Sequence, residues 1–277
     1  MVRRVLPGFG LSLGITLMYL GAIVVFPVSM LVLRAAHISF AQFQIILLSP
    51  RTMHAIGLTV WTSFVASSIN VLFGFVVAWV NTRYQYPFKR VVDALIDLPF
   101  ALPTSVAGIA LTAGFSPHGW LGKTIETTFG YQVAFRPLGI IVAMTFVGLP
   151  FVIRTLEPVL KEIDVEAEEA GASLGASKWQ IFSKILFPSL LPATITGFTL
   201  AFARVLGEFG SIVFISGNMP MKTEVVSLLI LSKLEQYDVV GAAALAAVMM
   251  VISFCLLMVI NGFQVWYQRR FFEASSS

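Results

Sequence analysis

Residues 164–188 read DVEAEEAGASLGASKWQIFSKILFP, a polar stretch inside a strongly apolar chain. The pattern predicts two helices joined by a turn. Asp164 is a suitable N-cap for the first helix, and Glu166 and Glu168 fall in its first turn, where the helix dipole favours negative charge. Gly175 is expected to end this helix, because glycine commonly follows the last helical residue.

The second helix of this stretch begins with a capping-box pattern, formed by Ser177 and Gln180, and Pro188 is expected to end it. A helix, a turn and a second helix at the mouth of a membrane bundle could transmit force to that bundle. The same pattern also fits a solvated amphipathic connection that only packs beneath the bundle. The pattern alone leaves both interpretations open.

The rest of the chain is apolar enough to belong in a lipid bilayer. Of its 277 residues, 57% are hydrophobic and 12% are charged, with a mean hydropathy of +0.88, whereas soluble domains have about 25% charged residues. A spanning helix needs about 20 apolar residues. We therefore predict a single all-α membrane domain over 1–277, with six spans at about 10–33, 56–81, 93–115, 138–156, 191–215 and 241–264 and a cytoplasmic loop at 157–190.

The first apolar run, 9–33, is too long for the apolar region of a signal peptide, which has roughly 7–15 residues. We expect it to be a retained first helix. Cys255 is the one cysteine in the sequence, so no disulfide framework or cysteine-based metal site is expected. His37, His54 and His118 lack the spacing of metal ligands, and we predict neither a metal site nor a catalytic site.

The distribution of lysine and arginine orients the chain. An even number of spans puts both termini on one side, together with the 157–190 loop. That side holds eleven basic residues and the other side holds six. The positive-inside rule therefore predicts a bacterial-type inner-membrane protein with both termini on the cytoplasmic side. The eleven are Arg3, Arg4, Arg83, Lys89, Arg90, Arg154, Lys161, Lys178, Lys184, Arg269 and Arg270. Because the charges lie at the edges of apolar runs and not in one basic patch, we expect the chain to contact the lipid bilayer and not to bind nucleic acid.

The third predicted span contains Pro99 and Pro103, which predict a kinked helix that faces protein rather than lipid. Such a helix often lines a pathway, although a kink made only for packing fits equally well. Asp93 and Asp97 fall in its first turns, where snorkelling to the interface and the helix dipole explain them.

Two ionisable residues lie inside the fifth predicted span. Arg204 and Glu208 stand four residues apart, so they share one helix face and can form an ion pair. Alternatively, Glu208 with Gly207 and Gly210 forms a gate at the centre of a pathway, and Arg204 supplies positive potential for a dianion. A third possibility is that the glycines serve only close helix packing.

The polar stretch quoted above resembles the EAA loop of ABC-importer permeases. The matching residues are Glu169-Ala170-Gly171, then Gly175, and then Ile185 to Pro188, at the spacing of that family's pattern. Gly171 replaces an alanine and Phe187 a leucine. The resemblance implies that the loop docks on a separate ATP-hydrolysing subunit, with Glu169, Ala170, Gly171 and Gly175 as coupling residues.

The similarity is closest to the sulfate/thiosulfate branch of these permeases. It is carried by the stretches DALIDLPFALPTSVAG at 93–108, LGEFG at 206–210 and KTEV at 222–225. It implies a CysW-like second permease subunit, two CysA-like ATPases that bind ATP and Mg, and a periplasmic sulfate/thiosulfate-binding protein. This chain itself has no nucleotide-binding loop and no cofactor. The alternatives are a molybdate/tungstate ABC permease, an ion-coupled secondary transporter and a membrane scaffold without transport activity.

Overall fold

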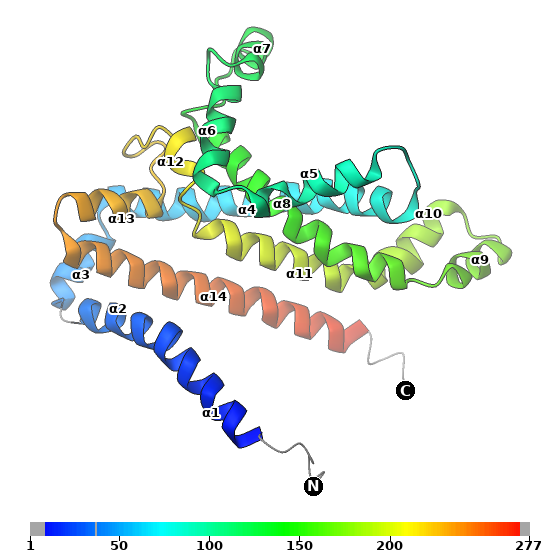
Figure 1. Ribbon diagram of the computed structural model, residues 1–277, viewed down its shortest axis with the longest axis horizontal. Coiled ribbons are helices and arrows are strands. Elements are labelled where there is room, and N and C mark those ends of the chain that lie inside the picture. The colour runs from blue at the N-terminus through cyan, green and yellow to red at the C-terminus, as the bar shows by residue number, and fades with distance from the viewer. Residues whose placement is uncertain (1–8, 37, 272–277) are drawn as a thin grey trace.

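A computed structural model describes residues 9–36 and 38–271, and this part of the chain is entirely helical (Figure 1). In chain order its helices, with two π-helical segments written as η, are α1 (Phe9–Leu20), η1 (Gly21–Val25), α2 (Phe26–Ala36), α3 (Phe40–Leu47), α4 (Pro50–Arg83), α5 (Lys89–Ala101), α6 (Thr104–Phe115), α7 (Trp120–Phe129), α8 (Pro137–Glu162), α9 (Val165–Ser173), α10 (Lys178–Ile181), η2 (Phe182–Leu186), α11 (Phe187–Leu206), α12 (Ile212–Ile215), α13 (Val226–Glu235) and α14 (Val239–Phe271).

Three long helices, α4, α8 and α11, pack against one another and form the core of the bundle. Small residues bring their backbones close together. A Cβ atom placed on Gly197 of α11 would lie 3.2 Å from the Cα atom of Val152 in α8, and one on Gly148 of α8 would lie 2.5 Å from the side-chain amide of Asn70 in α4. Small residues at such contacts are how membrane helices gain packing energy without a hydrophobic driving force between them.

The interior of the bundle combines apolar side chains with a row of buried polar ones. The buried face of α4 consists mainly of small and polar residues, among them Thr59, Ser63, Ser67 and Asn70. Thr59 donates its hydroxyl to the carbonyl of Ala55, one turn earlier in the helix, at 2.7 Å. Large apolar side chains such as Ile140, Met144 and Leu156 fill other parts of the interior, and many more are exposed on the outside. An apolar surface fits a protein whose surroundings are hydrocarbon.

The outer helices are much less buried. None of the residues of α1 is buried, and α1 leans away from the bundle (Figure 1). Helix α14 packs against α2, α11 and α13. Within the described residues, five helices are long and apolar enough to cross a membrane, or six if α5 and α6 together make one span.

The third predicted span, 93–115, is not one kinked helix. It is broken into α5 and α6, which meet at 114°. Leu102 and Pro103 between them are extended, with ψ angles of 135° and 133°. The ring of Pro103 disfavours helical geometry at Leu102, whereas Leu98 before Pro99 stays helical within α5, so a proline by itself does not decide the break. The kink expected from the two prolines is therefore a complete break.

The fifth predicted span, 191–215, is displaced towards the N-terminus. The apolar helix covers Lys178–Leu206, with Gly207 as its C-cap, so the polar loop is shorter than the 157–190 expected. Pro188 does not end the second helix of the loop. A π-helical turn at Phe182–Leu186 precedes it. In a regular α-helix the ring of Pro188 would clash with the carbonyl of Lys184, and the wider π-turn, which includes Lys184, avoids this clash. The segment Gly21–Val25 stands in the same relation to Pro27.

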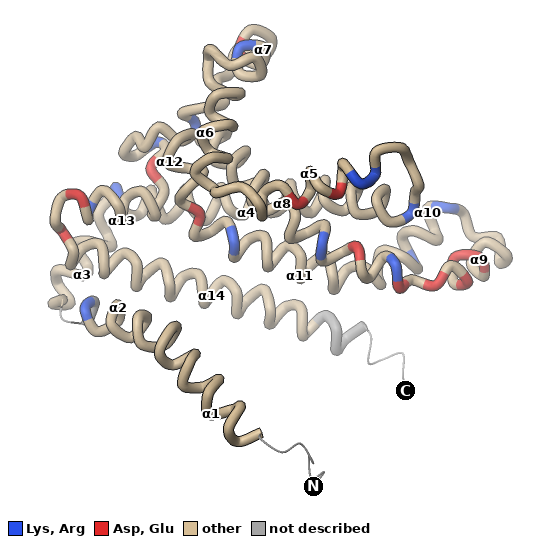
Figure 2. Tube along the Cα trace, viewed as in Figure 1, with Lys and Arg blue, Asp and Glu red and all other residues tan. Residues whose placement is uncertain are grey.

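Both ends of the described chain point towards the end of the bundle that carries α9 and α10 (Figure 1). Lysine and arginine gather at this end, and acidic residues gather over α9 (Figure 2). Of the basic residues used to orient the chain, Arg3 and Arg4 lie outside the described residues, as do the side chains of Arg269 and Arg270.

We predict that Gly197→Val destabilises the bundle by about 1–3 kcal/mol, because the added side chain would strike the α8 backbone. Gly57→Val on α4 is the matched control, since nothing lies within 4 Å of a Cβ at that position. Thermal unfolding of the purified protein in detergent measures both variants. Equal melting temperatures for the two would contradict the close packing of α8 and α11.

Candidate coupling surface and helix-break site

Helix α9 and the turn after it have the geometry predicted for the polar loop. Asp164 occupies the N-cap position, although its side chain accepts no capping hydrogen bond. Gly175 has a φ of +81°. The amide of Ala176 donates to the carbonyl of Gly171 at 3.1 Å, and the amide of Gly175 donates to that of Ala172 at 3.0 Å. These two bonds form a Schellman turn, which requires the left-handed backbone that glycine adopts without strain.

The second helix of the loop begins with the predicted capping box. Gln180 donates its backbone amide to the Ser177 hydroxyl at 3.3 Å, and its side-chain oxygen accepts from the Ser177 amide at 2.7 Å. The two helices pack closely through Gly171, where a Cβ would lie 3.0 Å from the end of the Ile185 side chain. The glycine in place of alanine therefore lets α9 approach its neighbour.

The outer side of this turn is open to solvent. Glu169, Ala170 and Gly175 are exposed, and Gly171 is buried. Leu174 is 89% exposed and Trp179 is 71% exposed, which is unusual for large apolar side chains at a polar end of the molecule. A hollow of about 390 Å³ opens beside Leu174; its lining residues are Gly171, Leu174, Gly175, Ala176, Gln180, Lys184 and Ile185. The turn thus has the exposed apolar residues and the hollow of a docking surface.

An ion pair ties α9 to the core. Arg83, the last residue of α4, lies 2.7 Å from a carboxylate oxygen of Glu168, and its guanidinium stands 5.4 Å from the ring centre of Trp79. The side chains of Arg83 and Glu168 are 19% and 26% exposed. A force on α9 would therefore reach the end of α4 directly.

The second group of predicted residues surrounds the end of α11. Arg204 and Glu208 do form an ion pair, at 2.6 Å, with Glu208 only 2% exposed. They do not share a helix face, however, because the helix ends at Leu206 and Glu208 lies in the turn beyond it. One oxygen of Glu208 also accepts from the amide of Ser211 at 3.0 Å and from its hydroxyl at 3.1 Å. The carboxylate thus holds together the irregular backbone after Gly207.

This irregular segment lies against the break between α5 and α6. A Cβ on Gly210 would lie 2.1 Å from the hydroxyl of Thr104, the first residue of α6. A Cβ on Gly108 would lie 2.5 Å from the carbonyl oxygen of Ser211. Both positions therefore need glycine for close approach. The structure brings together two interrupted helices that sequence analysis treated separately.

A third polar group was not predicted. Arg154 of α8 donates two hydrogen bonds to Asp97 of α5, at 2.8 and 2.7 Å, and one to Glu157 at 2.6 Å. Asn81 of α4 donates to both Asp93 and Glu157 at 2.7 Å. The explanation of Asp93 and Asp97 by snorkelling and the helix dipole is therefore wrong. Both aspartates face Arg154, which is 57 residues from Asp97 along the chain.

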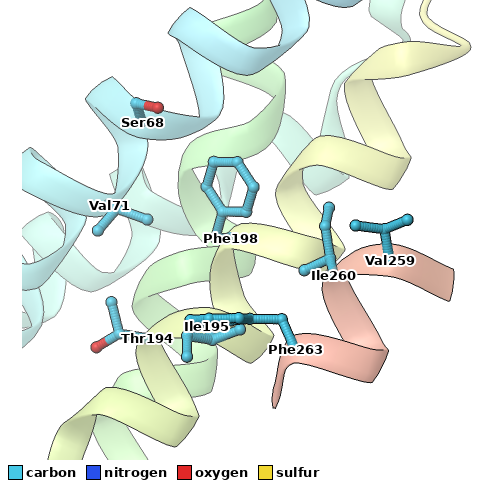
Figure 3. A pocket seen from close by; sticks show the side chains of 8 residues that line it. All are labelled: Ser68, Val71, Thr194, Ile195, Phe198, Val259, Ile260 and Phe263. Atoms are coloured by element: carbon cyan, nitrogen blue, oxygen red, sulfur yellow. The ribbon is translucent and has the colours of Figure 1, made fainter. Parts of the chain in front are cut away.

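An apolar cavity on the side of the bundle does not suit an anion. It has a volume of about 520 Å³ and lies between α4, α11 and α14 (Figure 3). Two hydroxyl groups line it, and both donate to carbonyls of their own helices, Ser68 to Phe64 and Thr194 to Leu190. No polar group remains to bind a charged ligand. Among the described residues there is also no group of three or more His, Cys, Asp or Glu that could hold a metal ion.

The described residues thus contain a broken third span in contact with the segment after α11 and an exposed helix-turn-helix at one end of the bundle. Residues 70–273 match the family described as the binding-protein-dependent transport system inner membrane component. The chain belongs to this family. The membership confirms the ABC-importer permease resemblance and rules against the ion-coupled and scaffold alternatives.

Among its relatives is the sulfate transport system permease protein CysT of Escherichia coli, 46% identical over 268 residues, which cover 97% of this chain and 96% of the relative. A probable CysT of Chlorella vulgaris is 50% identical over 216 residues, which cover 78% of this chain and 81% of the relative. A solved bacterial alginate ABC transporter has the same fold, with a TM-score of 0.72 at 18% identity, over 94% of this chain and 93% of that one.

We predict that Gly210→Ala lowers the melting temperature of the purified protein, because its methyl group would push the segment after α11 away from Thr104; overpacking of this kind costs about 1–3 kcal/mol. Gly114→Ala in α6 is the control, since a Cβ there meets nothing within 4 Å. Unchanged stability of the Gly210 variant would mean that the two helix breaks are not held in contact.

Proposed function

We propose that this chain is a membrane-spanning permease subunit of an ATP-driven sulfate importer. The observation that carries the proposal is the 46% identity with a sulfate transport system permease over 97% of the chain, which includes the helix-break and coupling residues. The same observation favours sulfate over the molybdate/tungstate alternative. Thiosulfate, a dianion of similar size, is proposed as a second substrate.

The chain does not hydrolyse ATP in this proposal. Two CysA-like ATPase subunits bind ATP and Mg, a CysW-like permease completes the membrane part, and a periplasmic binding protein delivers the anion. The exposed α1, of which no residue is buried, supports a further membrane subunit, since the helix makes little contact within its own chain. These partners follow from the family resemblance.

The ATPase is proposed to dock on the turn that follows α9. Glu169, Ala170 and Gly175 are exposed there, beside the 89% exposed Leu174. Trp179, on the helix after this turn, is 71% exposed, and tryptophan is one of the residues that most often anchor a protein interface. This docking would put α9, both ends of the described chain and the basic residues on the cytoplasmic side.

The anion pathway is proposed to pass the contact between the two helix breaks. Non-helical backbone at membrane depth is tolerated where it is buried in protein or lines a water-filled cavity. Arg204 is 38% exposed and makes one ion pair with Glu208 in the described part of the chain. Its other N–H groups can therefore face an anion while the pair holds the guanidinium in place.

We predict that Glu169→Arg releases the ATPase from the complex. Recovery of the ATPase with the tagged permease should fall about tenfold or more, as for other central interface residues. Glu235→Arg is the control, because it makes the same change of charge on an exposed residue at the opposite end of the bundle. Full ATPase recovery with the Glu169 variant would exclude docking at α9.

We predict that Arg204→Ala lowers uptake of labelled sulfate by about tenfold at a matched amount of assembled complex, since the positive charge near the pathway raises the local anion concentration. Lys123→Ala on α7 removes a positive charge from an exposed position away from the breaks and should leave uptake unchanged. Wild-type uptake by the Arg204 variant would remove this residue from the pathway.

A further inference from the structure

We propose that Arg154 is a positioning residue. It holds the α5 half of the broken third span against α8, so that α4, α5, α8 and α9 move as one body and the motion is taken up at Leu102–Pro103. The inference rests on the proposed function, because it concerns how movement at the ATPase-docking surface reaches the pathway.

The first step is the geometry around Arg154. Its Nε and Nη2 atoms donate to the two oxygens of Asp97, at 2.8 and 2.7 Å, which is the bidentate arrangement that fixes orientation as well as distance. Its Nη2 atom also donates to the backbone carbonyl of Asp93 at 3.3 Å. Since both aspartates belong to α5, the arginine fixes that helix at two successive turns.

The second step is the buried side of the cluster. Glu157, on α8, is 8% exposed and receives one hydrogen bond from Arg154 and one from Asn81 of α4. The hydroxyl of Tyr86 donates to the side-chain oxygen of Asn81 at 3.0 Å. A buried carboxylate with two fixed donors resists movement, because losing either donor leaves a charge poorly solvated. The cluster therefore joins α4, α5 and α8.

The third step is the scarcity of other anchors for α5. Ile96 is its one buried residue, and Phe100 makes an edge-to-face contact with Phe151 of α8 at 5.1 Å between ring centres. Other large apolar residues of α5 are exposed, including Val91 at 54% and Leu95 at 59%. Apolar packing alone therefore holds α5 weakly, and the charged cluster supplies most of its fixed orientation.

The fourth step connects the cluster to both functional regions. Helix α8 ends at Glu162 and α9 begins at Val165, so few residues separate them. Helix α9 is also bound to α4 through the pair of Arg83 and Glu168, close in sequence to Asn81. At its other end α5 leads to Pro103, and α6 after it contacts Gly210. A displacement of α9 can thus reach the helix-break contact through α5.

The experiment measures coupling rather than activity alone. The assembled wild-type and Asp97→Asn complexes are placed in proteoliposomes, and sulfate uptake and ATP hydrolysis are recorded together. We expect the amide to lower uptake per ATP hydrolysed by about fivefold to tenfold, a size typical of residues that carry coupling between sites. Asp97→Glu keeps the carboxylate and should restore part of the ratio.

The matched control is Asp238→Asn. It also removes a carboxylate bound to a cation at 2.7 Å, from Lys233, but lies between α13 and α14 at the other end of the bundle. Its ratio should equal that of wild type. A wild-type ratio for Asp97→Asn, whatever its yield of complex, overturns the inference. If the wild-type complex itself transports no sulfate, the proposed function has failed instead.

A second measurement leaves the residues of the Arg154 cluster unsubstituted. Spin labels at Leu95→Cys in α5 and Lys161→Cys in α8, in a Cys255→Ser background, report the distance across the proposed rigid body. Labels at Leu95→Cys and Ile109→Cys report the distance across the break to α6. Adding ATP to the complex should change the second distance and leave the first unchanged. An equal change in both would show that α5 does not move with α8.

Discussion

Irregular backbone in this protein is constrained by the absence of water in the hydrocarbon core. Every N–H and C=O group at membrane depth needs a partner within the protein, so helices can be interrupted only where another segment covers the gap. The break at Leu102–Pro103 and the one after Leu206 meet this requirement together. The glycines at 108 and 210 let the two segments touch, and Glu208 accepts hydrogen bonds from Ser211 within the second break.

Packing in the bundle follows from the same surroundings. Helices α4, α8 and α11 approach closely through small residues, and the hydroxyls of Thr59, Thr62 and Ser68 on α4 donate to carbonyls of their own helix. Many large apolar side chains face outwards. The apolar cavity between α4, α11 and α14 belongs to this lipid-facing side, whereas the polar contacts that suit transport lie at the helix breaks and at the α9 end.

The charged residues are organised along the axis of the bundle. Arg83 binds the acidic helix α9 to the core, Arg154 joins α5 to α8, and Arg204 pairs with Glu208 beside the breaks. Each arginine therefore fixes one segment of the chain against another. These ion pairs connect the α9 end of the bundle, through α8 and α5, with the contact between the two helix breaks.

The sequence by itself determined the features that depend on neighbouring residues. The capping box at Ser177 and the left-handed turn at Gly175 were predictable because caps and turns are local, and the spans follow from apolar length. The ion pair of Arg204 and Glu208 was also predictable, because the two residues are four apart in the sequence. The end of the helix at Leu206, between them, was not predicted.

Tertiary structure decided the rest, because it depends on contacts between residues far apart in the chain. Whether a proline bends a helix, breaks it at residue 103 or is absorbed by a π-turn before residue 188 depends on what is packed around it. The partner of Asp97 was equally undetermined, since Arg154 lies on another helix and only the folded bundle brings the two together.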